Sequence, residues 1–457
     1  MNRITRRRWL RNAFSAGATL ALAPSLGAAT RATPWRNWSG GHVAHPAGRF
    51  VPESEAALAE FLAQSTGQIR PVGSGHSFSP LVPTDGHLIV LDRLTGMIDH
   101  DAASNHATFH AGTRLGDMGA PLEAVGQAMI NLPDIDRQTL AGATATATHG
   151  TGLAFNTLSA YVAGLRLVTV TGDVLDLDVN NRPDVFAAAR VGLGALGVVT
   201  RIRMQNRPVY RLRERTWFQR TEEVLEGFDQ KAAAHRHFEM FPLTHSDYAI
   251  VLEIDETDAP VANPPVSPEE DAGFDNQMRE WYGLPVAERR AAINATVEQM
   301  IGPPSEVVDV SYKVLANVRN YRFNEMEYSV PVEAGAECLR EVLRTIEERA
   351  IDVVFPLEYR YIKGDDLWLS MFSGGDRAAI SIHQDARFDY RPYFDVIEPI
   401  FWKYGGRPHW GKVNNLGHAE LTKLYPRFEE FRAIRETLDP KGRLLNDHLR
   451  RQLGVPA

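Results

Sequence analysis

The sequence has almost no cysteine, no excess of basic residues and no long apolar run. Its 457 residues include one cysteine, Cys338, which excludes a disulfide framework and a cysteine-rich metal site. The formal net charge of −8 argues against a nucleic-acid-binding protein with a dominant basic face. No apolar run is long and uninterrupted enough to predict a stable membrane span. The composition, with 44% hydrophobic and 23% charged residues, is typical of a folded globular protein of two or three domains.

The first 29 residues have a composition of their own. They combine five arginines and no acid with an apolar run at 13–29. Residues 5–11, Thr-Arg-Arg-Arg-Trp-Leu-Arg, resemble a bacterial twin-arginine export signal, and small residues at 27–29 or 26–28 offer a cleavage site. The resemblance implies that 1–29 is a signal peptide read by the twin-arginine export machinery, and that the protein is periplasmic or secreted. Because that route carries folded proteins, it also favours an enzyme with an inserted organic cofactor. The alternative is a basic N-terminus without ordered structure.

After residue 30 the sequence divides into two regions, with a boundary near 206–210. In the first region, short apolar runs broken by Gly, Pro and Asp predict a helix at 54–65 and many small strands. These strands are expected at 69–72, 88–91, 107–110, 161–169, 174–178 and 198–204. In the second region, helices at 287–301 and 333–350 alternate with strands at 249–254, 324–330 and 378–383. This pattern predicts an α+β protein.

Two further segments of the second half have predicted roles. The proline- and acid-rich segment 255–271 is expected to be an exposed loop. The chain is expected to end with a helix and a short tail within 427–453. Cys338 falls among Leu339, Val342 and Ile346 at helical spacing, which is typical of a core position.

Two clusters of small residues in the first region suggest a ligand. Residues 72–77, Val-Gly-Ser-Gly-His-Ser, follow a strand, and their alternate glycines can present successive N–H groups to a pyrophosphate while His76 projects from the loop. The alternative is a tight turn with a buried histidine. Residues 140–152, Leu-Ala-Gly-Ala-Thr-Ala-Thr-Ala-Thr-His-Gly-Thr-Gly, carry so little bulk that a large flat ligand can lie against their backbone. The alternative here is a small-residue element packed against a neighbour.

A third cluster, Gly-Leu-Gly-Ala-Leu-Gly at 192–197, matches the dinucleotide fingerprint G-x-G-x-x-G. That fingerprint requires a strand before it, a helix after it and an acid about 20 residues further on. Here a predicted helix at 184–190 precedes the cluster, a predicted strand follows, and residues 211–215 are mostly basic. The context excludes a nicotinamide-binding Rossmann domain.

In their order and spacing, the three clusters resemble the FAD-binding domain of the vanillyl-alcohol oxidase superfamily. Other segments resemble its sugar-lactone and alditol oxidases, a group that includes gulonolactone oxidase and arabinono-1,4-lactone oxidase. They are Trp-Arg-Asn-Trp-Ser-Gly at 35–40, Phe-Asn-Glu-Met-Glu-Tyr-Ser-Val-Pro at 323–331, Glu-Tyr-Arg at 358–360, Pro-His-Trp-Gly-Lys at 408–412, and Leu-Asn-Asp-His-Leu at 445–449, with His where Tyr is usual. The resemblance covers nearly all of residues 35–450.

The resemblance implies a domain order and a cofactor. A two-part PCMH-type FAD-binding domain at 30–206 would precede an α+β substrate (cap) domain at 207–425, and residues 426–457 would return to the FAD domain. FAD is the implied cofactor, with a covalent bond from His76 to its 8α-methyl group. The matching FAD-binding positions are Gly73, Ser74, Gly75, His76, Ser77, Gly142, Ala143, Thr148, Gly150, Thr151, Gly197 and Val199.

The resemblance also implies a set of catalytic residues. Glu358 and Arg360 are two residues apart on a predicted strand, so they share one face, and the resemblance puts that face over the flavin. An acid–base group beside a cation suits alcohol oxidation, because the hydroxyl proton must leave as hydride moves to the flavin. Lys412 would stabilise the reduced flavin or bind a substrate hydroxyl. Ser381, His383 and His409 are the expected substrate-binding residues, although each could make a structural hydrogen bond instead.

The sequence therefore predicts an FAD-dependent enzyme that oxidises a CH–OH group of an aldono-1,4-lactone of the gulono, galactono or arabinono type. Electrons would pass to O2 or to another acceptor. The alternatives are an alditol or aldose oxidase acting on open-chain polyols, and a catalytically silent sugar-binding protein. No metal is expected: His235 and His237 have suitable alternate spacing, but no third ligand is apparent.

Overall fold

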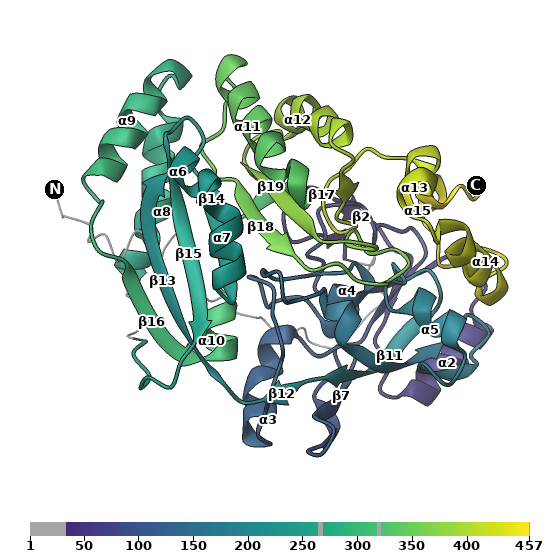
Figure 1. Cartoon of the computed structure of the whole chain (residues 1–457). Helices are drawn as coiled ribbons and strands as arrows, with labels where there is room; N and C mark the ends of the chain where they lie inside the picture. Colours follow the sequence, from purple (N-terminus) through teal and green to yellow (C-terminus); the bar gives the residue numbers. More distant parts are fainter. Residues whose placement is uncertain (1–32, 264–267, 318–320, 457) are drawn as a thin grey trace.

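The computed structural model describes residues 33–263, 268–317 and 321–456 (Figure 1). The predicted export signal at 1–29 lies outside the described residues. No described helix has both the length and the apolar character that crossing a bilayer requires.

Within the described residues, the first region is built on two larger sheets and four α-helices. A five-stranded antiparallel sheet has the order β10 (Val174–Leu177), β9 (Val162–Val168), β11 (Val198–Gln205), β7 (His106–His110) and β6 (Met97–Asp101). A three-stranded parallel sheet has the order β3 (Gly48–Phe50), β5 (His87–Val90) and β4 (Ile69–Val72). The helices are α2 (Glu55–Gln64), α3 (Gly119–Ala124), α4 (Leu140–Ala145) and α5 (Pro183–Ala189). Short pairs link β1 (Trp35–Arg36) to β2 (Val43–Ala44) and β8 (Gln127–Ala128) to β12 (Arg207–Pro208).

Local sequence explains these elements. Along β11, buried and partly exposed residues alternate, as expected for a strand with one face against a core. The side chain of Ser54 accepts a hydrogen bond from the N–H of Ala57 and so caps the N-terminus of α2. The predicted helix and all six predicted strands of this region are confirmed to within one residue at each end.

The second region is built on one eight-stranded sheet. Its order is β16 (Ser305–Val310), β13 (Arg211–Arg220), β15 (Tyr248–Glu256), β14 (His237–Pro242), β18 (Glu358–Ile362), β19 (Arg377–Asp385), β17 (Phe323–Pro331) and β20 (Arg407–Pro408). The helices of this region are α6 (Thr221–Glu226), α7 (Phe228–Ala234), α8 (Pro268–Tyr282), α9 (Val286–Glu298), α10 (Ser311–Leu315), α11 (Val332–Glu348), α12 (Arg391–Lys403) and α13 (His418–Leu424). Helices α11 and α12 pack against the sheet at β17, which leaves the opposite face of β17 for the first region (Figure 1). Cys338 is fully buried on α11, which confirms the core position predicted for it.

Two predictions about the second half are corrected. The segment 255–271 is not one loop, because β15 continues to Glu256 and α8 begins at Pro268. Proline followed by three acids is a helix-start signal that the loop interpretation overlooked. The end of the chain holds two helices rather than one, α14 (Phe428–Leu438) and α15 (Asp447–Leu453). Asp439 separates them, because its carboxylate accepts hydrogen bonds from the N–H groups of Arg443 and Leu444.

The segment between α14 and α15 lies against the first region. The carbonyl oxygen of Arg443 accepts a hydrogen bond from the N–H of Ile69 at 2.8 Å, and that of Leu445 accepts one from Gln68 Nε2 at 2.7 Å. Leu444 is fully buried in a small core shared with α2 and β4. In Figure 1 α14 lies beside α5 of the first region. The last segment of the chain is therefore part of the support of β4.

Candidate active site

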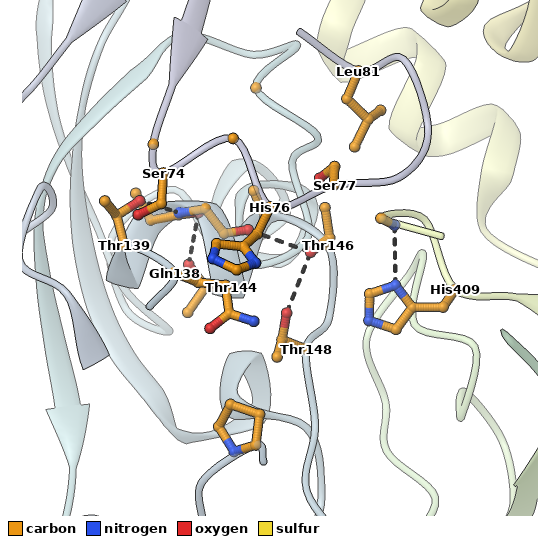
Figure 2. Close-up of a pocket in the computed structure, with 18 of the residues that line it drawn as sticks. Ser74, His76, Ser77, Leu81, Gln138, Thr139, Thr144, Thr146, Thr148 and His409 are labelled. Carbon is orange, nitrogen blue, oxygen red and sulfur yellow. Dashed lines mark hydrogen bonds between the residues drawn. The ribbon is translucent and has the colours of Figure 1, made fainter. Parts of the chain in front are cut away.

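One elongated cavity lies between the two regions. On one side it is lined by the loop that follows β4, by α4 and the residues after it, and by the segment 192–199. On the other side it is lined by β17, β18 and β19 and by residues 409–412. Figure 2 shows the first side, with His76 near the centre and Thr139, Thr144, Thr146 and Thr148 around it.

The loop at 73–77 exposes backbone to this cavity. A Cβ atom on Gly73 would lie 2.2 Å from Thr139 Oγ1, and Gly75 has a φ of +69°, so glycine is required at both positions. The backbone N–H groups of residues 74–77 donate to no backbone carbonyl of the described chain. The loop thus has the form of a nest of free N–H donors, which suits an anionic group such as a pyrophosphate.

The threonines of α4 and its N-cap make hydrogen bonds within that segment. Thr139 caps α4 by accepting a hydrogen bond from the N–H of Gly142, and the hydroxyl of Thr144 donates to the carbonyl of Leu140 at 2.9 Å. Thr146 and Thr148 contact one another through their hydroxyl groups at 3.4 Å (Figure 2). The segment therefore presents an uncharged surface of small side chains to the cavity.

The segment 192–197 lies on the same side of the cavity and is anchored by a buried arginine. It follows α5 and precedes β11, the reverse of the order that a dinucleotide fingerprint needs. Arg70 donates to the carbonyl oxygens of Leu193 at 3.1 Å and Gly194 at 2.9 Å. Gly194 has a φ of +62°, so a side chain here would be strained. Gly197 and Val199 both line the cavity.

His76 faces the cavity, and its ring makes no hydrogen bond to any described residue. Its ring stacks on Trp38, with 5.0 Å between ring centroids and 21° between the planes. Burial, reinforced by the positive charges of Lys412, Arg114 and Arg137, lowers the pKa of His76 to about 4. The imidazole is therefore neutral at physiological pH, which is the nucleophilic form.

The opposite side of the cavity is a polar face of the large sheet. Register places Ser381 of β19 directly between Glu327 of β17 and Glu358 of β18. One step along the sheet, Glu325 is opposite His383. Residues two apart on a strand share a face, so these side chains all point the same way.

Glu358 and Arg360 form a buried pair on this face. Arg360 Nη1 lies 2.7 Å from Glu358 Oε1, and the side chains are 7% and 9% exposed. Burial raises the pKa of Glu358 to about 8, against the opposing effect of Arg360 and with the help of the negative charges of Glu239, Asp134 and Glu325. A carboxyl group with a pKa near neutrality can give and take a proton at physiological pH.

Lys412 is held by a second carboxylate. Its Nζ atom pairs with Glu325 Oε2, and His383 Nε2 lies 3.5 Å from Glu325 Oε1. Although burial acts to raise it, the pKa of Glu325 is lowered to about 2 by Lys412 and by His383. The ammonium group of Lys412 also lies 5.2 Å from the centroid of the Phe78 ring. Lys412 is thus a fixed positive charge beside the glycine loop.

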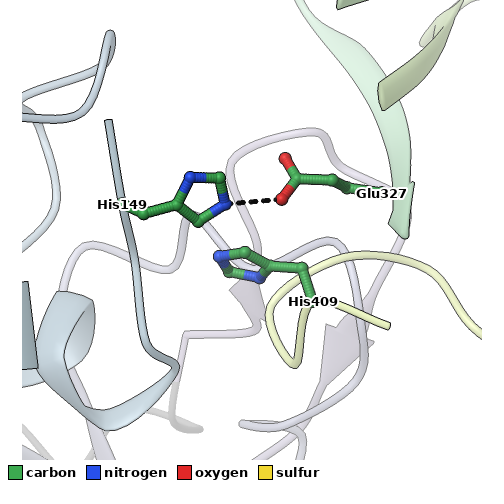
Figure 3. A group of neighbouring side chains, drawn as sticks. All are labelled: His149, Glu327 and His409. Carbon is green, nitrogen blue, oxygen red and sulfur yellow. Dashed lines mark hydrogen bonds and ion pairs between the residues drawn. The ribbon is translucent and has the colours of Figure 1, made fainter. Parts of the chain in front are cut away.

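A third carboxylate, Glu327, lies at the centre of a buried cluster (Figure 3). It has no exposed surface and contacts His149, Arg360 and Ser381. The ligating atoms of His149, Glu327 and His409 lie within 4.8 Å of one another, and all three residues line the cavity or its floor.

A second, smaller cavity lies behind Arg360. Gly150 and Thr151 line it rather than the main cavity, and the hydroxyl of Thr151 donates to Glu239 Oε2. His237 also lines it: Nδ1 contacts the carbonyl of Thr151 at 2.7 Å, while Nε2 is buried without a partner.

Most of the predicted site residues converge on the main cavity, and a few do not. Its lining includes Gly73, Ser74, Gly75, His76, Ser77, Gly142, Thr148, Gly197, Val199, Glu358, Arg360, His383, His409 and Lys412. Ala143 is buried inside α4, and Ser381 is 1% exposed with its hydroxyl directed to Glu327. Sequence reasoning did not select Glu325, Glu327 and His149. Glu325 and Glu327 occupy alternate positions of a strand whose other residues are mostly apolar. Acids in such a strand need buried partners, and this pattern could have indicated a site.

The chain matches two families of known proteins. Residues 46–178 match an FAD binding domain, and residues 202–452 match the D-arabinono-1,4-lactone oxidase family. The second match spans more than half of the chain. The protein belongs to the D-arabinono-1,4-lactone oxidase family.

Relatives of this family cover nearly the whole chain. An L-gulono-1,4-lactone dehydrogenase of Mycobacterium tuberculosis (strain ATCC 25618 / H37Rv) is 37% identical over 434 residues, which are 92% of this chain and 99% of the relative. An L-gulonolactone oxidase of Bos taurus is 29% identical and covers 91% of this chain and 97% of its own. An alditol oxidase of Streptomyces is 26% identical over 91% of this chain and 97% of its own. The family assignment confirms an FAD-dependent oxidoreductase.

A solved structure shares the fold. Cholesterol oxidase from B. sterolicum superimposes with a TM-score of 0.75 at 16% identity, covering 92% of this chain and 96% of that chain. This confirms the predicted α+β architecture, in which a PCMH-type FAD-binding domain precedes a second α+β domain.

The residues of the cavity fit FAD. The free N–H groups of the loop 73–77 suit its pyrophosphate, and the uncharged small side chains of α4 suit a planar ring system. Apolar side chains at Val198, Ile89 and Leu167 line a further part of the cavity. The opposite face then brings ionisable groups to the ring system.

Proposed function

We propose that the protein oxidises a CH–OH group of an aldono-1,4-lactone of the gulono, galactono or arabinono type, with electrons passing to O2 or another acceptor. The observation that carries the proposal is the buried Glu358–Arg360 pair: Arg360 Nη1 lies 2.7 Å from Glu358 Oε1, and both residues line the cavity that fits FAD. The dehydrogenase and oxidases of L-gulono-1,4-lactone that are similar over nine-tenths of the chain support the choice of substrate.

When bound, FAD supplies the hydride acceptor for this oxidation. Glu358 takes the proton of the substrate hydroxyl, because its raised pKa matches a base that works near neutral to mildly alkaline pH. Arg360 holds the substrate oxygen as that proton leaves, since its guanidinium group is permanently charged. Lys412 supplies a second cation, for the cofactor or for a substrate hydroxyl, while Glu325 keeps it in position. His383 and His409 line the substrate end of the cavity.

The test is reduction of the bound flavin in the absence of oxygen. L-gulono-, L-galactono- and D-arabinono-1,4-lactone are each mixed anaerobically with the purified protein, and the flavin absorbance is followed. At least one lactone is expected to bleach it rapidly, and Glu358→Gln is expected to slow bleaching by about 10³-fold. Faster bleaching by xylitol or sorbitol than by every lactone would identify an alditol oxidase instead. Retained colour with every lactone and polyol would identify a silent sugar-binding protein.

We also propose that His76 carries FAD covalently. Its neutral imidazole faces the cavity, and its ring is supported by Trp38. The bond joins an imidazole nitrogen to the 8α-carbon: the imidazole N–H and one methyl C–H bond break, and the two electrons and two protons pass to the electron acceptor. The free ring nitrogens and rigid glycine turn support this assignment.

Denaturing electrophoresis tests the attachment. Flavin fluorescence is expected to stay with the protein band, and to be lost from the band in His76→Ala. His45→Ala, at an exposed histidine outside the cavity, is the matched control. A fluorescent band in His76→Ala would show that another residue carries the flavin, and a non-fluorescent wild-type band would show that FAD is held without a covalent bond.

We propose finally that the protein is exported by the twin-arginine machinery and works in the periplasm or outside the cell. The support is the sequence Thr-Arg-Arg-Arg-Trp-Leu-Arg at 5–11, followed by an apolar run and small residues. Replacement of Arg6 and Arg7 by lysine is expected to leave the full-length protein in the cytoplasmic fraction of a bacterial host. Equal amounts of wild type and variant in the periplasm would refute this route.

A further inference from the structure

The small cavity behind Arg360 has no part in the reaction as described so far. Its volume is about 30 Å³, which is room for one or two water molecules. Arg360 lines both this cavity and the main one, so this residue lies between them. The small cavity therefore contacts the active site through one of the catalytic side chains.

Strand register brings His237 and Glu239 next to Arg360. Glu239 of β14 is directly opposite Arg360 of β18. His237 lies two residues before Glu239 on the same strand, so the two side chains share one face of the sheet. His237 and Arg360 are thus diagonal neighbours, about 7–8 Å apart at the backbone, a separation that long side chains and rings can bridge. All three side chains line the small cavity.

His237 presents a hydrogen-bond acceptor that no protein group uses. Its Nδ1 lies 2.7 Å from the carbonyl oxygen of Thr151, and a carbonyl can only accept, so Nδ1 carries a hydrogen. Burial, helped by the positive charge of Arg236, lowers the pKa of His237 to about 3, so the ring is neutral and Nε2 is bare. The ring stacks on Phe155 with 5.0 Å between centroids, which fixes its plane. Nε2 is buried and has no hydrogen-bond partner in the described part of the chain.

Arg360 has the complementary group, a donor without an acceptor. Its Nη1 pairs with Glu358 and its Nη2 donates to Glu327, and both of these carboxyl groups line the main cavity. Its Nε is buried and donates to none of the described residues. Leaving a buried guanidinium N–H unsatisfied is costly, so such groups in native proteins bond to protein or to ordered water.

Water fits these groups better than a cation does. A water molecule can accept from Arg360 Nε while it donates to His237 Nε2 and to the carboxyl group of Glu239. These are three hydrogen bonds, the usual number for buried water. A cation cannot accept from Arg360, and the guanidinium charge would repel it. Within the described ranges, His237 also belongs to no group of three ligating atoms that lie within 4.8 Å of one another.

We propose that the small cavity holds a water molecule that joins His237, Glu239 and Arg360, and that His237 and Glu239 are thereby positioning residues for Arg360. The water site rests on the register, the cavity and the two unpartnered atoms. The effect on catalysis rests on the proposed function.

The water gives Arg360 a hydrogen bond that does not depend on the catalytic base. Glu358 loses its charge whenever it takes up a proton, and its attraction for Arg360 then weakens. Arg360 in turn lowers the pKa of Glu358, against burial and the nearby carboxyl groups of Glu239, Asp134 and Glu325. If Arg360 loses the water and moves away, the pKa of Glu358 is expected to rise above its value of about 8.

Two substitutions of His237 separate the water site from structural support of the neighbouring backbone. His237→Asn keeps a donor near the position of Nδ1, where it reaches Thr151, and removes the acceptor at the cavity. His237→Gln keeps an acceptor near the position of Nε2 and removes the donor to Thr151. His45→Asn, at an exposed histidine outside both cavities, is the control.

The positioning role is tested by following kcat/KM for a lactone from pH 6 to 10 in the folded, FAD-loaded proteins. In His237→Asn, the midpoint of the rise with pH is expected to move up by about one pH unit, which lowers kcat/KM at pH 7 by about tenfold. His237→Gln and the control are expected to keep the midpoint of the wild type. An unmoved midpoint in His237→Asn, or a larger shift in His237→Gln, would overturn the positioning role.

The water itself is tested by a high-resolution crystal structure of the FAD-loaded protein. We expect density for a water molecule within hydrogen-bond distance of His237 Nε2 and Arg360 Nε, and loss of that density in His237→Asn. A cavity without density, or one that holds a metal or alkali ion, would overturn the proposal. A wild type that oxidises no lactone would instead refute the proposed function, and the density would still decide the water site.

Discussion

Two parts of the cavity wall, one on each side, are built from different kinds of residue. On the side of the first region, the loop 73–77 and the segment 139–148 together contain one ionisable side chain, His76. On the side of the large sheet, Glu325, Glu327 and Arg360 alternate with apolar residues that face the other way. These two segments of the first side offer backbone and small side chains, whereas the sheet offers charge.

The difference separates two tasks. A large planar cofactor binds against small uncharged residues without the cost of removing charged groups from water. Proton and hydride transfer need fixed charges and a tunable base, and these sit on a rigid sheet whose register fixes their spacing. Substitutions on the first side should therefore change cofactor uptake, and those on the second should change turnover.

The largest expected effect is on turnover. Glu358→Gln is expected to lower kcat by about 10³-fold, since the base is lost, while FAD content stays at the wild-type value. Single-turnover kinetics and the flavin-to-protein absorbance ratio measure the two quantities. The control is Glu348→Gln at an exposed position of α11. Loss of FAD together with activity would break the separation of the two sides.

The pH dependence of the reaction should follow the same base. Because burial raises the pKa of Glu358 to about 8, the carboxylate is the minor form at pH 6 and the major form above pH 8. We expect kcat/KM to rise about tenfold per pH unit from pH 6 and to level off above about pH 8. A profile that falls with pH over this range would mean that the protonated form of the site is the active one.

The first side should respond in cofactor binding. A Cβ atom at Gly73 would lie 2.2 Å from Thr139 Oγ1 and within 3.3 Å of two further atoms of that side chain. Such crowding costs about 1–3 kcal/mol, so Gly73→Ala is expected to weaken FAD binding by about tenfold or more. The measurement is FAD titration in a His76→Ala background, where uptake is reversible.

Two further variants identify the cause. Thr139→Ala combined with Gly73→Ala is expected to restore part of the affinity, because it removes Oγ1 and Cγ2, two of the three atoms that the new Cβ meets. Gly67→Ala, where nothing lies within 4 Å, is expected to bind FAD as the parent does. Equal losses in Gly73→Ala and Gly67→Ala would rule out the crowding explanation.

The smallest expected effect is on stability. Thr139→Ala removes the side-chain cap of α4 and is expected to lower the free energy of unfolding by about 1 kcal/mol. Urea denaturation in the His76→Ala background, from which FAD can be removed, measures it. A change of several kcal/mol would show that Thr139 does more than cap the helix.

Local patterns predicted much of the fold. Short strands such as β4 and β11, and helices such as α2 and α11, follow from alternation, apolar stripes and caps that lie within a few residues. The two misjudged segments, 255–271 and the end of the chain, contain prolines and glycines that both end and begin elements. Single-sequence patterns do not separate those two uses.

The site was harder to predict because it depends on register between distant strands. The pair Glu358 and Arg360 could be predicted because both residues lie on one strand. The position of Ser381 between Glu327 and Glu358 follows instead from the order β18-β19-β17. The bond from His149 to Glu327 joins residues 178 positions apart. No spacing within the sequence shows that these two residues meet. The two acids of β17, Glu325 and Glu327, indicate only that hydrogen-bond or ion-pair partners exist.

The backbone of residues 443–446 has a consequence for how the protein matures. Its carbonyl oxygens accept hydrogen bonds from the strand that leads into the glycine loop, namely from Gln68, Ile69 and Arg70. A nascent chain that has not yet reached residue 443 therefore lacks these hydrogen bonds before its glycine loop. The support of the cofactor loop depends on a segment that is synthesised long after the loop itself.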